Sequence, residues 1–176
     1  MENIALFKAT IADLASLQKI SRETFFETFA EHNTADNMAK YLDQEFTEHK
    51  LSAELNNHNS AFYFAEHEGN IIGYLKVNFG NAQTELKEDN ALEIERIYVS
   101  KQFLGKGVGQ VLYDKAIEIA NNKNADYVWL GVWEENHRAI NFYKKNGFTQ
   151  FNKHLFMLGE DEQTDIMMKL KLIRNS

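Results

Sequence analysis

The chain contains no cysteine and no proline among its 176 residues, and the first of these absences restricts its chemistry. Without cysteine there are no disulfides, no thiolate nucleophiles and no metal sites with thiolate ligands. This agrees with a reducing compartment, and we expect a cytoplasmic protein. No apolar run approaches the roughly 20 residues of a membrane span, and the N-terminal MENIALFKAT lacks the pattern of a signal peptide. We therefore expect no membrane association.

Positive charge is also scarce, because 19 Lys and Arg residues stand against 26 Asp and Glu residues and give a formal net charge of -7. Nucleic-acid binding requires clustered basic residues, and the sequence shows no such cluster, so no nucleic-acid partner is expected. A small cationic partner suits this charge better. The six histidines are scattered and no HExxH motif occurs, so we expect no metal.

The length and composition indicate a single domain over residues 1–176. Apolar residues make up 44% of the chain and charged residues 26%, which is ordinary for a globular protein. A chain of this length buries roughly 70% of its unfolded surface, which is enough for one substantial core. The sequence leaves the oligomeric state open, a homo-oligomer included.

Hydrophobic periodicity predicts an alternation of strands and helices. We expect strands at 4–8, 61–78 (a hairpin turning at Glu68, Gly69 and Asn70), 91–99, 127–133, 148–158 and 164–172, with a loop over 80–90. We expect helices at 10–28, at 108–120 and at 136–146, and two short helices within 34–57. The order strand, helix, strand between 91 and 133 is a crossover, which makes the fourth and fifth strands parallel. The expected fold class is α/β, with a mixed sheet of about seven strands flanked by helices.

A glycine-rich loop, LGKGVG at residues 104–109, lies between the fourth strand and the following helix. Its unpaired backbone N–H groups at a helix N-terminus are suited to a pyrophosphate, and an empty glycine-rich turn is the simpler alternative. A P-loop requires Ser or Thr after the Gly-Lys pair, whereas Gly105-Lys106 is followed by glycine. A dinucleotide fingerprint requires a third glycine where Leu112 stands. Neither of these two nucleotide motifs is present.

The loop resembles the acyl-CoA loop of the GCN5-related N-acetyltransferases, whose pattern is Gln/Arg-x-x-Gly-x-Gly/Ala. Residues 136–148, NHRAINFYKKNGF, are similar to a second signature of that family, Asn-x-x-Ala-x-x-Phe-Tyr-x-x-x-Gly-Phe. A literal match beginning at Gln102 also exists, but the register beginning at Leu104 places Val111 and Leu112 at the first core positions of the helix. In that register Leu104 replaces the family's Gln or Arg. The resemblance implies a sheet splayed between strands four and five, and acetyl-CoA as co-substrate.

Within that family, several tracts resemble the PaiA-type polyamine N-acetyltransferases of Gram-positive bacteria. The tracts are ETFFETFAEHNTADNM, LEIERIYV, WLGVWEEN, FYKKNGF and GEDEQTDIMMK, and they span nearly the whole chain. The resemblance implies direct acetyl transfer from acetyl-CoA to a primary amine of spermidine or spermine. Two alternatives stay open: an acetyltransferase for another amine, such as a protein N-terminus, an aminoglycoside or an amino acid, and a non-catalytic acyl-CoA sensor.

Candidate catalytic residues lie on the fourth strand and on the last helix. Strand alternation places Glu93 and Glu95 on one face, about 7 Å apart. It places Leu92, Ile94, Arg96 and Tyr98 on the other face. The resemblance implies that a carboxylate on this strand accepts the amine proton, commonly through water, so Glu95 or Glu93 is the candidate base; a surface ion pair is the alternative for each. It also implies that Tyr143 protonates the leaving thiolate, and a phenol with a pKa near ~10 is protonated at neutral pH.

The resemblance further assigns binding residues. Backbone groups of Ile97, Tyr98 and Val99 are expected along the pantetheine arm, and Asn136 and Lys145 near the pantetheine and the adenosine 3′-phosphate. The expected pyrophosphate cradle consists of Leu104, Gly105, Lys106, Gly107, Val108 and Gly109. A polyamine requires carboxylates and an aromatic wall, and the candidate lining residues are Glu23, Glu27, Trp133 and Glu134.

Overall fold

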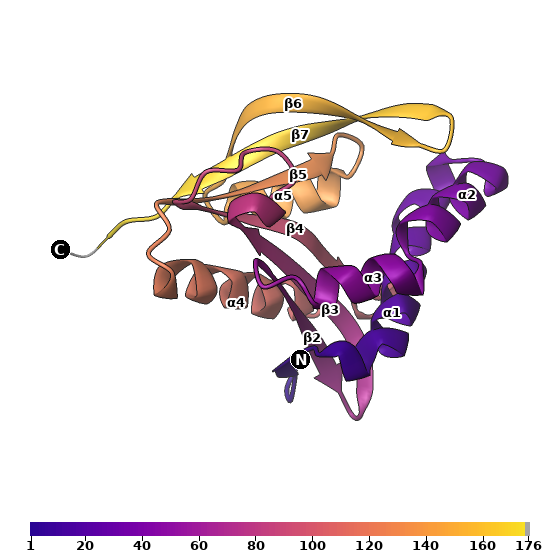
Figure 1. Cartoon of the computed structure of the whole chain (residues 1–176), viewed down its shortest axis with the longest axis horizontal. Coiled ribbons are helices and arrows are strands. Elements are labelled where there is room, and N and C mark those ends of the chain that lie inside the picture. The colour runs from indigo at the N-terminus through magenta and orange to yellow at the C-terminus, as the bar shows by residue number, and fades with distance from the viewer. Residues whose placement is uncertain (175–176) are drawn as a thin grey trace.

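The computed structural model describes residues 1–174 and contains one seven-stranded mixed sheet with the strand order β1-β2-β3-β4-β5-β7-β6 (Figure 1). The strands are β1 (Ala5–Lys8), β2 (Ser60–His67), β3 (Asn70–Phe79), β4 (Ala91–Val99), β5 (Tyr127–Trp133), β6 (Thr149–Leu158) and β7 (Asp161–Lys171). The α-helices are α1 (Leu14–Phe29), α2 (Ala35–Glu45), α3 (Glu48–Leu55), α4 (Val108–Asn122) and α5 (His137–Lys145). Neighbouring strands are antiparallel except β4 and β5, which are parallel as the crossover predicts. The predicted α/β fold class is confirmed.

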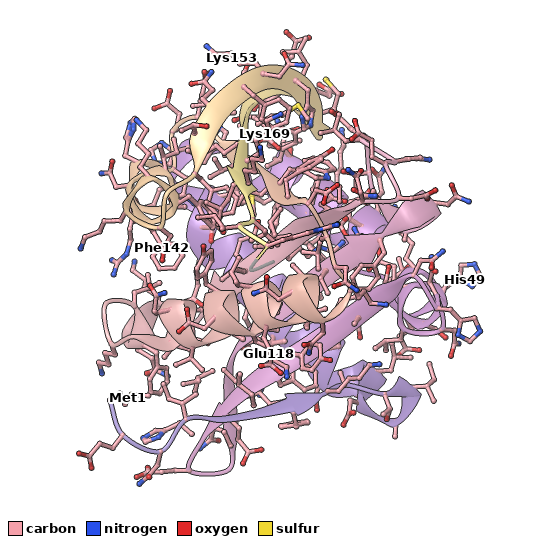
Figure 2. All side chains as sticks on the ribbon, turned by 90° about the vertical axis from the view of Figure 1, so that its left-hand side faces the viewer. Met1, His49, Glu118, Phe142, Lys153 and Lys169 are labelled. Atoms are coloured by element: carbon pink, nitrogen blue, oxygen red, sulfur yellow. The ribbon has the colours of Figure 1, made fainter. Side chains whose placement is uncertain are left out.

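Helices cover both faces of the sheet, and each face has its own apolar core. On one face, Leu17 of α1, Met38 of α2 and Leu51 of α3 are buried with aromatic residues of β2 and β3. On the other face, Leu112 of α4 and Ile140 of α5 are buried with aliphatic residues of β3, β4 and β5. Figure 2 shows this second face, where α4 runs across the sheet below Phe142 of α5. The molecule therefore has three layers: helix, sheet and helix.

Local sequence signals determine where the helices begin. The hydroxyl groups of Thr34 and Thr47 accept hydrogen bonds from the backbone N–H groups of Asn37 and Lys50, which caps α2 and α3. Helix α4 is different, because its N-cap is Gly107 with φ 85° and no side chain takes part. The backbone N–H groups of its first turn therefore lie at the end of the glycine loop without a competing side-chain acceptor.

Several predicted boundaries differ from the structure, and three of the differences change how an element begins. Strand β7 begins at Asp161, three residues before the predicted start, so β6 and β7 form a tight hairpin. The helix predicted from residue 10 begins as a short 3-10 turn (Ile11–Asp13) before α1. Asn70, predicted to be a turn residue, is the first residue of β3. Among residues 1–174, no helix is both long enough and apolar enough to cross a bilayer.

Strand β4 contains a bulge that the sequence analysis did not predict. Arg96 pairs with Lys76 and Ile94 pairs with Val77, so Glu95 is an extra residue in the ladder. The extra residue reverses the alternation, and Ile97 joins the core on the α4 face while Tyr98 packs in the core on the α1 face. The prediction that Arg96 and Tyr98 share a face with Leu92 and Ile94 is therefore wrong. They lie on the face of Glu93 and Glu95.

Strands β4 and β5 separate soon after they begin. Residues 91–93 pair with residues 127–129, and no further pairs join the two strands. Strand β5 remains fully paired with β7 on its other side, and β4 with β3. The predicted splay between the fourth and fifth strands is confirmed, and it leaves one edge of β4 unpaired over residues 94–99.

Gly73 of β3 lies where the backbone packs closely against both the neighbouring strand β4 and helix α4. A Cβ atom at this position would lie 2.8 Å from the Tyr98 carbonyl oxygen and 3.3 Å from Leu112 Cδ1. We expect Gly73→Ala to lower the free energy of unfolding by about 1–3 kcal/mol, because the backbone must shift to admit it. The matched control is Gly109→Ala, where the added Cβ meets no atom within 4 Å. Urea unfolding measures both, and equal stabilities would contradict the prediction.

Candidate active site

Two hollows meet where β4 and β5 separate. The larger, which we call the outer cleft, has a volume of about 640 Å³ and lies between the glycine loop, the end of α1 and the start of α5. The smaller, which we call the inner cavity, has a volume of about 270 Å³ and lies between the sheet and helices α1 and α2. The residues that line both hollows are Ile97, Tyr98, Trp133, Asn136, Ala139 and Tyr143. These six residues form the junction.

The glycine loop forms one wall of the outer cleft through Leu104, Gly105, Gly107 and Gly109. Gly105 and Gly107 have positive φ values of 73° and 85°, which only glycine adopts without strain. A Cβ atom at Gly107 or Gly109 would meet no atom within 4 Å, so the backbone there faces open space. The arrangement is a helix N-terminus with accessible N–H groups, which favours an anionic ligand.

The other residues expected to bind the phosphate groups of acetyl-CoA occupy varied positions. Leu104 is 40% exposed in the cleft wall, whereas Val108 points into the core beneath α4. Lys106 is exposed, and its ammonium nitrogen lies 5.3 Å from the centre of the Phe103 ring. Lys145 is exposed at the end of α5 and lines neither hollow. Val108 can therefore offer a ligand its backbone only.

Helix α5 and its N-cap supply three residues of the junction: Asn136, Ala139 and Tyr143. Asn136 caps this helix, because its side-chain oxygen accepts a hydrogen bond from the Ala139 N–H at 3.2 Å. Tyr143 is buried against Phe142 and Phe148, with ring centres 5.3 and 5.6 Å away. Burial raises the pKa of the Tyr143 phenol, with a smaller contribution from Tyr113. The phenol is therefore protonated throughout the neutral range, as a proton donor must be.

The two candidate carboxylates lie side by side on one face, as the alternation of β4 predicts. The side-chain amide of Asn78 donates to Glu93 Oε1 at 2.9 Å and to Glu95 Oε2 at 3.0 Å. Thr84 also donates to Glu93, through its N–H at 2.8 Å and its hydroxyl at 2.5 Å. Burial raises the pKa of Glu93 against the opposing effect of these hydrogen bonds.

Glu95 has the opposite electrostatic character. It forms ion pairs with Lys76 and, at 3.7 Å, with Arg96, and both cations are also paired with Glu54 of α3. Burial alone would raise the pKa of Glu95, but the charges of Arg96 and Lys76 lower it to about 2. A carboxylate held this firmly in its ionised form is a weak proton acceptor at neutral pH.

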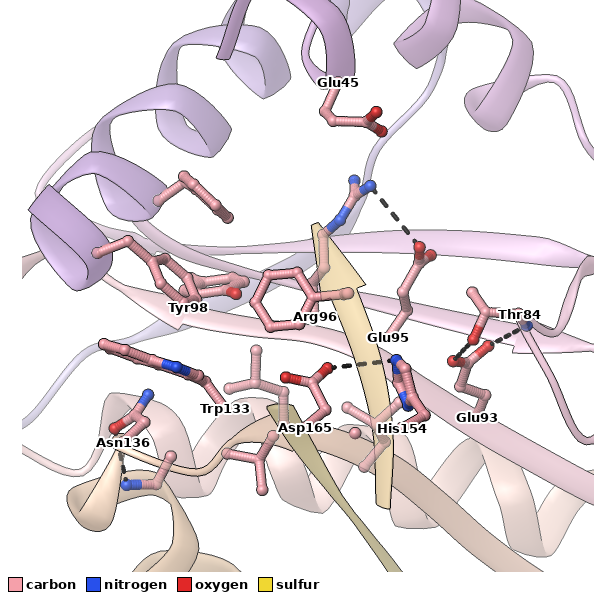
Figure 3. A pocket seen from close by; sticks show the side chains of 18 of the residues that line it. Glu45, Thr84, Glu93, Glu95, Arg96, Tyr98, Trp133, Asn136, His154 and Asp165 are labelled. Carbon is pink, nitrogen blue, oxygen red and sulfur yellow. Dashed lines mark hydrogen bonds and ion pairs between the residues drawn. The ribbon is translucent and has the colours of Figure 1, made fainter. Parts of the chain in front are cut away.

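The inner cavity also contains an acidic residue and a histidine that the sequence analysis missed. Asp165 of β7 and His154 of β6 line it, and Figure 3 shows the Asp165 carboxylate turned toward the His154 ring. Burial raises the pKa of Asp165 to about 6. A usable signal was present, because Asp165 directly precedes the apolar run Ile-Met-Met of a strand. That position places a carboxylate close to the two buried residues of β7, Met167 and Met168.

The comparisons with known proteins agree with this geometry. Residues 14–148 match the model of the acetyltransferase (GNAT) family. An uncharacterized N-acetyltransferase in the pepI 3′ region of Lactobacillus delbrueckii subsp. lactis is 41% identical over 173 residues, which cover 98% of this chain and 100% of the relative. The chain belongs to the GNAT family.

Two further similar proteins have a named activity or a bound ligand. Spermidine N(1)-acetyltransferase of Thermoplasma acidophilum is 25% identical over 150 residues, which cover 83% of this chain and 88% of that enzyme. The crystal structure of the PaiA N-acetyltransferase of T. acidophilum, in complex with coenzyme A, superposes with a TM-score of 0.79 at 23% identity. That superposition covers 97% of this chain and 99% of the other, and it shows that the two share a fold.

The acidic residues expected to line a GNAT substrate site are not grouped as predicted. Of the four candidates, Trp133 lines the inner cavity, but Glu23, Glu27 and Glu134 do not. Glu23 and Glu27 lie beside a separate surface hollow at α1, where Glu27 accepts a hydrogen bond from the Lys101 N–H at 3.0 Å. Glu27 also lines the outer cleft. Glu134 lines none of the three hollows. Among residues 1–174 no cluster of His, Asp and Glu suited to a metal ion is found.

Glu95 should stabilise the fold rather than accept a proton. We expect Glu95→Gln to lower the free energy of unfolding by about 1–3 kcal/mol at pH 7, because Lys76 and Arg96 lose a buried anionic partner. The folded pKa of about 2 lies below the unfolded value of 4.5, so this stabilisation is present above pH 4.5 and is lost as the pH falls toward 2.

Chemical unfolding of wild type and variant at several pH values measures this difference. The control is Glu45→Gln, which removes a partly exposed ion pair with Lys50 worth less than about 1 kcal/mol. Equal losses in the two variants, or a difference that does not change with pH, would refute the assignment.

Proposed function

We propose that this GNAT acetyltransferase transfers an acetyl group from acetyl-CoA to a primary amine of a polyamine such as spermidine or spermine. The observation that carries the proposal is the junction at Tyr143, where a cleft suited to an anionic nucleotide meets an aromatic cavity rich in carboxylates. A thioester and an amine that enter from opposite sides would meet at this junction. The cysteine-free composition fits action in a reducing cytoplasm.

The outer cleft has the features that an acyl-CoA requires. The N–H groups at the start of α4 would hold the pyrophosphate, and the unpaired edge of β4 at residues 97–99 would pair with the amide groups of the pantetheine arm. Lys101 and Arg138 line the cleft and add positive charge. Lys106 of the glycine loop and Lys145 of α5 are exposed, and both belong to segments that border the cleft. They are the candidates for binding the adenosine 3′-phosphate.

Two residues would carry the proton transfers. Bound acetyl-CoA supplies the thioester carbonyl that the amine attacks, with cleavage of the C–S bond. Glu93 is a better base than Glu95, because burial raises its pKa while Glu95 is held ionised; it would take the ammonium proton through water. Tyr143 would donate its phenolic proton to the departing sulfur, and the second proton released by the acetylated nitrogen would restore the phenol.

The inner cavity has the lining expected for a flexible polycation. Aromatic rings attract cations through their faces, and carboxylates supply the opposite charge. The aromatic lining residues are Phe25, Phe29, Tyr41, Phe46, Tyr98, Trp129, Trp133, Tyr143 and Phe156. The acidic lining residues are Glu45, Glu93, Glu95 and Asp165. Glu45 and Glu95 are paired with lysine or arginine of the protein, so Glu93 and Asp165 are the acidic residues that favour a substrate with positive charge.

Tyr143 can be tested with a single-atom change. We expect Tyr143→Phe to lower kcat about tenfold or more, while the KM for acetyl-CoA changes little, because only the proton donor is removed. The matched control is Tyr113→Phe, since Tyr113 packs in the same aromatic group and lines neither hollow. Steady-state release of free CoA measures both variants. Unchanged turnover in Tyr143→Phe would remove Tyr143 from the chemistry.

A panel of amines tests the substrate class. We expect the purified protein to acetylate spermidine and spermine with higher kcat/KM than a dipeptide, an aminoglycoside or a free amino acid, because the polyamines are more cationic than a dipeptide or an amino acid and more slender than an aminoglycoside. Release of free CoA is the readout. Turnover of a peptide or an aminoglycoside without turnover of spermidine would refute the polyamine assignment. Tight CoA binding without turnover of any amine would instead indicate an acyl-CoA sensor.

A further inference from the structure

Asp165 differs from the other carboxylates of the inner cavity, because its charge is not balanced from within the protein. Among residues 1–174, its side chain accepts no hydrogen bond, and the nitrogen that it approaches as an ion pair is His154 Nε2 at 3.7 Å. This separation is beyond hydrogen-bond range. The side chain is only 20% exposed, so water does not fully replace the missing donors.

The remaining acidic residues of the cavity already have partners. Glu93 accepts three hydrogen bonds from Asn78 and Thr84. Glu95 is paired with two cations, and Glu45 Oε2 lies 2.6 Å from the ammonium nitrogen of Lys50. Asp165 is therefore the carboxylate with the greatest unmet demand for a cation.

Protonation of His154 would not cancel this demand. The second ring nitrogen of His154, Nδ1, lies 3.3 Å from Glu85 Oε1, so the imidazole is placed between two carboxylates. A single positive charge on the ring would leave the group of Asp165, His154 and Glu85 with a net negative charge. The cluster thus attracts a cation in either state of the histidine.

The backbone leaves space in front of this cluster. Gly131 of β5 lies beside it, and a Cβ atom there would be 3.3 Å from Asp165 Oδ2 and 3.5 Å from His154 Cε1. Asp165 pairs in register with Trp133, an aromatic residue of the junction, but Asp165 itself lines only the inner cavity. The carboxylate is therefore on the acceptor side of the junction, away from the outer cleft.

We propose that Asp165, supported by His154 and Glu85, binds a second ammonium group of the substrate while the first is held at the junction for acetylation. This inference rests on the proposed function and deepens it, since it makes the enzyme selective for diamines and polyamines over monoamines. Asp165 is a specificity-determining residue in this scheme. It accepts no proton from the reacting nitrogen and serves to anchor the distal end of the chain.

A matched pair of substrates tests the anchor. With 1,4-diaminobutane and spermidine, we expect Asp165→Asn to raise KM about tenfold or more and to change kcat little, because one charge contact is lost in the bound state. With butylamine, whose single amino group must occupy the reacting position, KM should not change. The control is Glu162→Gln, which removes an exposed carboxylate from the same strand.

The wild-type protein supplies a second test that needs no variant. The raised pKa of about 6 means that Asp165 loses its charge as the pH falls below 6, so kcat/KM should fall more steeply for the diamine than for butylamine. The titratable or charged groups that face Asp165 from the neighbouring elements are His154, Glu85, Glu93, Glu95, Arg96, Tyr98, Tyr41 and Glu45. Groups whose titration affects the reacting nitrogen act on both substrates. Their effects therefore cancel in the ratio of kcat/KM for the diamine to kcat/KM for butylamine.

The outcomes separate the two proposals. Normal polyamine turnover with an unchanged KM in Asp165→Asn overturns the anchor and leaves the proposed function intact. An equal loss for diamine and monoamine overturns it too, since it places Asp165 at the reacting nitrogen. A wild-type protein that acetylates no polyamine overturns the proposed function, and the anchor with it.

Discussion

The separation of β4 from β5 is the constraint on which the rest of the site depends. Only residues 91–93 pair with residues 127–129, and both the outer cleft and the inner cavity open beside the unpaired part. An unpaired strand edge inside a protein is costly unless a ligand or water satisfies its N–H and C=O groups. The fold tolerates this edge because β3 and β7 hold the two strands from their outer sides. The gap is thus a permanent feature of the folded chain.

The bulge at Glu95 determines which side chains face the gap. By adding one residue to β4, it places Glu95, Arg96 and Tyr98 together on the face of Glu93. Arg96 and Lys76 then bridge Glu95 to Glu54 of α3, which ties the helical layer to the bulged strand. Burying this many charges is favourable only if each is paired, and the paired charges remain unavailable to a substrate. Glu54 and Glu95 therefore serve the fold, and binding of a cationic substrate is left to carboxylates that lack such partners.

The sequence predicted the elements well and the side-chain environment of the cavity poorly. The order of strands and helices, the parallel crossover and the glycine loop follow from periodicity and from local glycine chemistry, which act over a few residues. The orientation of Arg96 did not follow, because a bulge depends on the neighbouring strand and leaves no local signature in LEIERIYV. Asp165 was missed because its strand was predicted to begin only one residue earlier, and the pairing with β6 that buries it is a tertiary contact.

The predicted substrate residues show why composition is a weak guide to a cavity. Glu23 and Glu27 are acidic and lie on the helix that borders the site, yet neither lines the inner cavity: both line the separate surface hollow, and Glu27 also lines the outer cleft. The cavity instead takes its acidic residues from three elements distant in sequence: α2, β4 and β7. Among these acidic residues, the hydrogen-bond donors and cations that the protein supplies to each carboxylate indicate its role better than its position in the sequence does. Glu93 and Glu95 are satisfied by the protein, whereas Asp165 faces an aromatic cavity with one imidazole at ion-pair distance. A carboxylate kept in that condition by the fold gains most from an external cation, and selectivity for the charge of the substrate follows from it.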